Sequence, residues 1–190
     1  MILTYLKTAW LVLAMALVFA ASLAAVQSLL APKILANQKN ETYDQLPNLV
    51  AGADAAATQE VQLAGLAVYK AIDKSGRQVG WVLRAGGAGY ADRLELLIGL
   101  DVPAKTITGL YVLDQKETPG LGNKISEPAW RAQFAGKDAA EAVTVIQASP
   151  KGNQIAAVSG ATISSQSVCN IVNAAVAAFR QALAQEKTTP

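Results

Sequence analysis

The densest group of side chains that could do chemistry is a run of hydroxyls late in the chain. It is the stretch Ser159-Gly160-Ala161-Thr162-Ile163-Ser164-Ser165. A long helix is expected to begin directly after it, and a helix N-terminus offers free N–H groups and the positive end of a dipole. The stretch therefore predicts a site for an anionic group, although not a P-loop, because GxxxxGK[ST] is absent. N-capping by Ser164 or Ser165 is the simpler interpretation of the same residues.

Two glycine-bearing loops precede the hydroxyl stretch. Glu117-Thr118-Pro119-Gly120-Leu121-Gly122 suits a type II turn, which favours proline in its second position and glycine in its third. Gly122 adds a point where the backbone can approach a ligand closely. The other loop, Gly86–Asp92, contains GxG but lacks the spacing and the strand–helix context of a dinucleotide site. We expect that loop to be a flexible turn.

Composition excludes several classes of function. The 190 residues carry 16 Lys and Arg against 14 Asp and Glu, so a net charge of +2 gives no basic stripe for nucleic acid. Histidine is absent and Cys169 is the one cysteine, which excludes Ser-His-Asp catalysis, His-ligated haem and cysteine-ligated iron–sulfur clusters. Redox or metal chemistry would need an organic cofactor or carboxylate ligands. We expect Cys169 to serve packing in the core.

The first 32 residues predict a membrane-spanning helix. They contain no acidic residue and one charged side chain, Lys7, and the apolar run is long enough to cross a bilayer. A cleaved signal peptide is the competing interpretation, since Ser22-Leu23-Ala24 is a plausible cleavage site. Both interpretations place the rest of the chain outside the cytoplasm. We divide the sequence into an anchor over 1–32, a helical stalk and linker over 33–60 that Pro47 breaks, and a domain over 61–190.

The domain reads as strands followed by a long helix. Residues 66–72 and 78–84 flank the turn signature Asp73-Lys74-Ser75-Gly76 and predict a hairpin. Residues 94–101 and 107–113 predict a second hairpin, and 143–146 a further short strand. This order predicts an α+β fold with an antiparallel or mixed sheet and a long C-terminal helix, not a doubly wound sheet.

Two helices are expected in the domain. A short one carries Pro128 near its start and Trp130 and Phe134 on one face, with Ser126 as its cap. The long C-terminal one has an apolar stripe at steps of three and four residues, formed by Val168, Val172, Ala175, Val176, Phe179 and Leu183.

Taken together, the motifs resemble those of the FMN-binding domain family. Ser159-Gly160-Ala161-Thr162-Ile163-Ser164-Ser165 is similar to the stretch in which the family's threonine carries FMN through a phosphoester. Glu117–Gly122 resembles the second family motif, and Gly89-Tyr90 the weaker first one. Within the family, the chain resembles the G subunits of Rnf ion-translocating electron-transport complexes. The C subunits of Na⁺-translocating NADH:quinone oxidoreductases are near relatives.

The resemblance implies a function and a site. A flavin transferase would attach FMN to Thr162, because a threonine hydroxyl without a base is a poor nucleophile. The protein would then relay electrons to and from membrane and iron–sulfur subunits of an Rnf-type complex, on the extracytoplasmic side of a bacterial inner membrane. The family pattern has aspartate where this chain has Ala156. The residues assigned to the cofactor are Thr162, Ser159, Gly160, Ala161, Ser164, Ser165, Glu117, Thr118, Gly120, Leu121, Gly122 and Tyr90.

Other functions fit parts of the same pattern. A membrane-tethered binding domain without covalent flavin would use the hydroxyl loop only to cap a helix and hold an anion. The equivalent subunit of a sodium-translocating NADH:quinone oxidoreductase, or a flavin sensor attached to another oxidoreductase, would use the same cofactor with different partners. For Tyr90, a half-buried tyrosine at a strand end is the alternative to a place beside the flavin ring.

Overall fold

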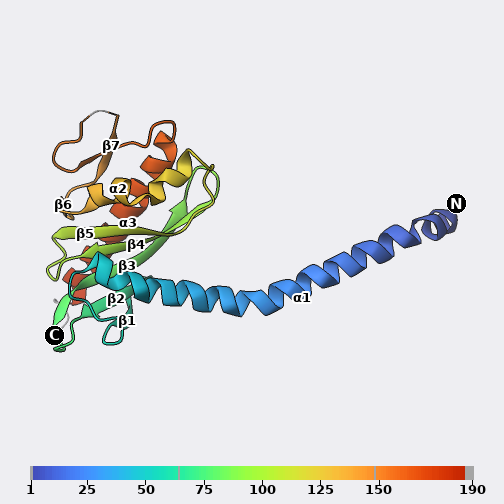
Figure 1. Ribbon diagram of the computed structural model, residues 1–190, viewed down its shortest axis with the longest axis horizontal. Coiled ribbons are helices and arrows are strands. Elements are labelled where there is room, and N and C mark those ends of the chain that lie inside the picture. Colours follow the sequence, from blue (N-terminus) through green and yellow to red (C-terminus); the bar gives the residue numbers. More distant parts are fainter. Residues whose placement is uncertain (1, 64, 148, 187–190) are drawn as a thin grey trace. The chain divides into compact units, whose positions relative to one another are not determined.

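A computed structural model describes residues 2–63, 65–147 and 149–186 of the chain (Figure 1). It divides into two compact units, Met1–Asn40 and Glu41–Pro190. The first unit consists of the greater part of one helix, α1 (Ile2–Leu49). An 18-residue window of this helix has a mean hydropathy of 2.4 and none of it is buried. By length and composition the helix can cross a membrane, and a signal sequence near an N-terminus has the same properties.

The helix continues past both of its prolines. Pro47 was expected to break it, yet α1 ends two residues later, at Leu49. Proline removes one N–H from the helical ladder, but the last turn is held by burial, because Leu46 and Leu49 are 0% and 4% exposed. The Val50 N–H also donates to the Leu46 carbonyl at 2.9 Å. Packing in this turn therefore outweighs the missing hydrogen bond.

The second unit is built on a six-stranded antiparallel sheet. Its strands are ordered as in the sequence, so each pairs with its neighbour along the chain (Figure 1). Both predicted hairpins are confirmed by the pairing of β2 with β3 and of β4 with β5. The strands are β1 (Gln59–Leu63), β2 (Leu66–Ile72), β3 (Gln78–Ala88), β4 (Arg93–Leu100), β5 (Thr106–Asp114) and β6 (Lys137–Asp138).

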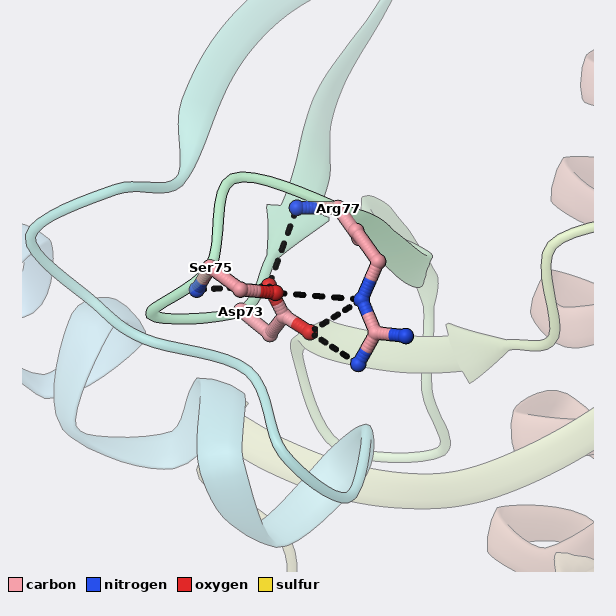
Figure 2. A network of polar contacts seen from close by, with 3 residues as sticks. All are labelled: Asp73, Ser75 and Arg77. Atoms are coloured by element: carbon pink, nitrogen blue, oxygen red, sulfur yellow. Dashed lines mark hydrogen bonds and ion pairs between the residues drawn. The ribbon is translucent and has the colours of Figure 1, made fainter.

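The turn between β2 and β3 is organised by one carboxylate. Asp73 Oδ1 accepts hydrogen bonds from the Ser75 N–H, the Ser75 hydroxyl and the Arg77 N–H, at 2.8, 2.6 and 2.9 Å (Figure 2). Its Oδ2 pairs with the Arg77 guanidinium at 3.0 Å. The Ser75 hydroxyl, followed by the Arg77 N–H, lowers the pKa of Asp73 to about 2. This turn fixes the register of the hairpin from within a five-residue segment.

Side chains alternate between two cores, one on each face of the sheet. In β4, Leu96 and Ile98 face one core while Leu97 faces the other, as a period of two residues requires. The larger core lies between the sheet and α3 (Thr162–Glu186), the long C-terminal helix. The smaller core lies under the segment 46–53, which begins with the last turn of α1. The central strands are therefore buried on both faces.

Short elements connect the sheet to α3. They are η1 (Gly122–Ser126), α2 (Pro128–Arg131), η2 (Ala132–Phe134), β7 (Thr144–Ile146) and β8 (Gln154–Ala156), of which β7 and β8 pair in parallel. The expectation that Ser126 caps the short helix is wrong, since Ser126 ends η1 and Glu127 holds the N-cap position. Helix α3 carries the predicted apolar stripe into the core, and Cys169 is fully buried there. Burial raises the pKa of that thiol to about 12. The α+β fold class is confirmed.

Candidate functional site

The loop after β5 forms the turn that its sequence predicts. The Leu121 N–H donates to the Thr118 carbonyl at 3.2 Å, and Gly120 between them has φ +77°. A positive φ at the third position defines a type II turn and is the reason for glycine there. The Gly120 N–H in turn donates to Asn123 Oδ1 at 2.8 Å. The loop thus holds Leu121 outward, where 45% of its surface is exposed.

A second turn of the same kind leads into α3. The Ala161 N–H donates to the Val158 carbonyl at 2.9 Å, and Gly160 has φ +78°. The two turns meet, because a Cβ on Gly160 would lie 3.1 Å from Leu121 Cδ2. The hydroxyl stretch and the Glu117–Gly122 loop, about forty residues apart in sequence, therefore form two walls of one site.

Helix α3 begins earlier than the sequence suggested. Its first residue is Thr162, so Ser164 and Ser165 lie inside the first turn and the prediction that either one caps the helix is wrong. The Ser165 hydroxyl instead accepts from the Val158 N–H at 3.0 Å and donates to the Ala161 carbonyl at 3.0 Å. It ties the preceding turn to the helix. At the start of α3, Thr162 and Ile163 are exposed, whereas Ser164 and Ser165 are buried.

The third loop is shorter than predicted. Gly86 and Gly87 belong to β3, so the expected flexible turn is wrong for the first half of Gly86–Asp92. Gly87 is needed for packing, because a Cβ there would lie 2.6 Å from Ile171 Cγ1 on α3. The turn itself occupies the residues after Ala88, and it presents Tyr90 with 64% of its surface exposed. Tyr90 is therefore not the half-buried strand-end residue of the alternative interpretation.

One buried carboxylate connects all three loops. Glu117, 4% exposed, accepts hydrogen bonds at Oε1 from the Tyr90 N–H at 2.8 Å and the Ala91 N–H at 3.2 Å. Its Oε2 accepts from the Ser164 hydroxyl at 2.7 Å. The partners lie 26, 27 and 47 residues away along the chain. Glu117 thus joins the β3–β4 turn and the start of α3 to its own loop.

The carboxylate also explains two of the glycines. A Cβ on Gly89 would overlap Glu117 Oε1. A Cβ on Gly122 would lie 2.8 Å from Glu117 Oε2 and 2.9 Å from Ser164 Oγ. Both contacts are shorter than carbon and oxygen atoms tolerate, so only glycine lets the two backbones approach this side chain.

The three loops surround a cavity of about 530 Å³. Its walls combine exposed apolar or aromatic side chains with the first turn of α3, the mixture typical of small-molecule sites. Eight of the predicted residues line the cavity together with Ile163, which the sequence reasoning missed. The lining residues are Tyr90, Thr118, Leu121, Gly122, Gly160, Ala161, Thr162, Ile163 and Ser164. The other predicted residues, Ser159, Ser165, Gly120 and Glu117, lie behind or beside these walls.

The start of α3 gives the cavity its polar end. Thr162, Ile163 and Ser164 are the first three residues of the helix, so their N–H groups have no carbonyl four residues back within it. In the described part of the chain, no hydrogen-bond acceptor is assigned to these three groups. They and the helix dipole provide a place for a negatively charged group.

One comparison with known proteins covers the part of the chain that forms this site. Residues 89–177 match the FMN-binding domain family. That range contains the Tyr90 turn, the Glu117–Gly122 loop, the hydroxyl stretch and most of α3. Residues 89–177 therefore resemble an FMN-binding domain, and the resemblance stated from the motifs is confirmed.

Relatives of the FMN-binding domain come from ion-translocating complexes. The chain is 39% identical over 108 residues to the G subunit of the ion-translocating oxidoreductase complex of Methanosarcina acetivorans, covering 57% of this chain and 55% of that protein. It is 38% identical over 119 residues to the G subunit of the Na⁺-translocating ferredoxin:NAD⁺ oxidoreductase complex of Acetobacterium woodii, covering 60% and 56%. The chain thus spans little more than half the length of these relatives.

A solved structure confirms the fold. NqrC of Shewanella oneidensis superposes with a TM-score of 0.54 over 73% of this chain and 70% of that one, at 22% identity. At that identity the likeness concerns the architecture alone. It confirms the arrangement of a sheet domain with a long C-terminal helix.

The chemical character of the cavity walls suits FMN. An isoalloxazine ring needs apolar walls with a few backbone donors, and a phosphate needs N–H groups and positive potential. The cavity offers Leu121, Ile163 and Tyr90 for the first and the start of α3 for the second. When bound, FMN supplies reversible electron transfer, which no side chain of this domain provides.

Proposed function

We propose that this protein carries FMN covalently on Thr162 through a phosphoester and relays electrons within an Rnf-type ion-translocating oxidoreductase complex. The observation that carries the proposal is the cavity in which the three family motifs meet, with an exposed threonine at the first position of α3. The relatives that the chain resembles are subunits of such complexes.

The choice of Thr162 rests on the state of each hydroxyl near the cavity. Ser164 and Ser165 are buried, and both hydroxyls already donate hydrogen bonds within the protein. The Ser164 hydroxyl donates to Glu117 and the Ser165 hydroxyl to the Ala161 carbonyl. Ser159 is exposed but does not line the cavity. Thr118 and Thr162 are exposed and do line it. Of these two, only Thr162 lies at a helix N-terminus, where the charge of a phosphodiester is stabilised.

Ala156 is compatible with this role. Its N–H donates to Gln133 Oε1 at 2.7 Å, and its carbonyl accepts from Trp130 Nε1 at 2.9 Å. The strand that leads to the hydroxyl stretch is therefore held through its backbone by side chains of α2 and η2. Nothing in this arrangement needs a carboxylate at position 156, so the fold of this segment accepts alanine there.

The rest of the chain fits a tethered relay. We propose residues 1–32 as a single membrane anchor, 33–60 as the stalk and linker, whose residues 46–53 pack on the sheet, and 61–190 as the FMN-binding domain on the extracytoplasmic side of a bacterial inner membrane. A covalent link keeps the cofactor at a high effective concentration where free FMN is scarce. Oxidation of a soluble donor and ion movement then fall to partner membrane and iron–sulfur subunits.

The test is the intact mass of the full chain after production with a flavin transferase. We expect wild type to gain the mass of FMN less one water and to fluoresce in a denaturing gel. Thr162→Val keeps the branched shape without the hydroxyl, and it should gain nothing. Thr118→Val, in the same cavity, and Thr144→Val, exposed on β7, should both be modified like wild type. Loss of the adduct in Thr118→Val but not in Thr162→Val would refute the assignment.

A further inference from the structure

We propose that Glu117 is the positioning residue of this site: it holds the three loops together, and its buried negative charge lowers the reduction potential of a flavin bound in the cavity. The second half of this statement rests on the proposed function. The first half concerns the protein alone. From the sequence, Glu117 was expected to contact the cofactor, and the structure places it one layer behind the wall.

The carboxylate has a complete set of partners. Its three hydrogen bonds come from two backbone N–H groups and one hydroxyl, all of them donors. An ionised carboxylate is acceptor-only, so the ionised form satisfies every contact, whereas a proton on Oε1 would face the N–H groups of Tyr90 and Ala91. Hydrogen bonds of this charged kind are stronger than neutral ones. Glu117 is thus able to order all three loops at once.

The charge lies close to the place where electrons would arrive. Glu117 Oε1 accepts from the Tyr90 N–H at 2.8 Å, and Tyr90 lines the cavity on the wall that we assign to the flavin ring. The three partners of the carboxylate are neutral, so they spread the charge without cancelling it. Reduction adds negative charge to a bound flavin, and a buried carboxylate nearby makes that addition less favourable because the local dielectric is low.

Geometry and charge can be separated by two substitutions. Glu117→Gln removes the charge but keeps the shape. Its amide oxygen can accept from Tyr90 and Ala91, while its amide nitrogen donates to a rotated Ser164 hydroxyl. Glu117→Ala removes every link. Glu60→Gln, on the exposed strand β1, makes the same change in net charge outside the site and is the matched control.

The first measurement is backbone amide exchange on the flavin-free full chain in detergent. We expect the Tyr90 and Ala91 amides to exchange at least tenfold faster in Glu117→Ala than in wild type, while amides of β3 and β4 keep their protection. Glu117→Gln and Glu60→Gln should exchange like wild type. Unchanged exchange in a folded Glu117→Ala would overturn the positioning role. If Glu117→Ala fails to fold, the Ser164→Ala variant, which lacks one link, should still exchange faster at these two amides.

The second measurement is the reduction potential of the flavin-loaded full chain. We expect a more positive potential for Glu117→Gln than for wild type and Glu60→Gln, which should agree with each other. Equal potentials in all three proteins would overturn the electrostatic role. A wild type that takes up no FMN would refute the proposed function together with this electrostatic role, and amide exchange would then decide the positioning role by itself.

Discussion

Asp73 and Glu117 are both carboxylates that accept hydrogen bonds from backbone N–H groups of loops. Asp73 is at the surface, its partners lie within four residues of it, and Arg77 neutralises its charge. Glu117 is buried, its partners lie 26 to 47 residues away, and all of them are neutral. The first carboxylate shapes one turn, whereas the second assembles a site from three.

This difference shows how the two turns are stabilised. Water can replace any contact of Asp73 at low cost, because an exposed donor that loses its partner is solvated. Around Glu117 the same loss leaves the Ser164 hydroxyl buried without its acceptor. The turn in Figure 2 sets the register of one hairpin through local contacts, whereas the contacts of Glu117 join distant segments of the sheet domain.

The largest effect is expected from Glu117→Ala. It leaves three donors without an acceptor and opens a hole beside Gly89 and Gly122. The buried Ser164 hydroxyl left unpaired costs about 1–3 kcal/mol, and the Tyr90 and Ala91 N–H groups, on exposed residues, add less because water can reach them. We expect the free energy of unfolding to fall by about 3 kcal/mol. Denaturation of the full chain in detergent, followed by tryptophan fluorescence, measures it. If the free energy of unfolding fell no more in Glu117→Ala than in Asp73→Ala, the proposed difference between the two carboxylates would be contradicted.

A smaller effect is expected from glycine substitutions in the Glu117–Gly122 loop. In Gly122→Ala the new methyl group meets Glu117 Oε2 and Ser164 Oγ at 2.8 and 2.9 Å, so the carboxylate must shift and FMN loading should fall severalfold. In Gly120→Ala nothing lies within 4 Å, and the cost is the positive φ of +77° alone, about 1 kcal/mol. FMN loading and stability are measured for both. Equal loading of the two variants would show that the contact with Glu117 is unimportant.

The Asp73 turn can be predicted from the sequence better than the surroundings of Glu117. The reason is the distance along the chain between the residues in contact. The Asp73 turn was readable, because its turn signature is contiguous and its hydrogen bonds join near neighbours. Both hairpins and the apolar stripe of α3 were readable for the same reason. The role of Glu117 was not, since nothing local shows that its partners are Tyr90, Ala91 and Ser164.

The errors have physical causes as well. Pro47 is tolerated because burial of Leu46 and Leu49 outweighs a lost hydrogen bond. Gly86 and Gly87 lie in β3, where α3 packs against the strand through Ile171. Ile163 was missed because, read as a pattern, it is the variable position between Thr162 and Ser164. The outcomes at Pro47 and at the two glycines depend on tertiary packing rather than on local propensity.

The smallest effect is expected from the pH dependence of the Asp73 turn. Its pKa in the folded protein is lowered to about 2, below the ordinary value of about 3.9. A depressed pKa means that the turn contributes its full stability above the ordinary value and loses it as the pH falls toward 2. The difference in melting temperature between wild type and Asp73→Asn should persist from pH 7 to 5 and shrink below pH 4. A difference independent of pH would contradict the stabilising role of the ionised carboxylate.

The most direct test of the covalent site is the position of the flavin on the chain. We would digest the protein after it has been produced with a flavin transferase, isolate the fluorescent peptide and locate the added mass by fragmentation. We expect one adduct, on Thr162, with Ser159, Thr118, Ser164 and Ser165 unmodified. An adduct on any of those four residues, or a folded protein without any adduct, would contradict the site described here.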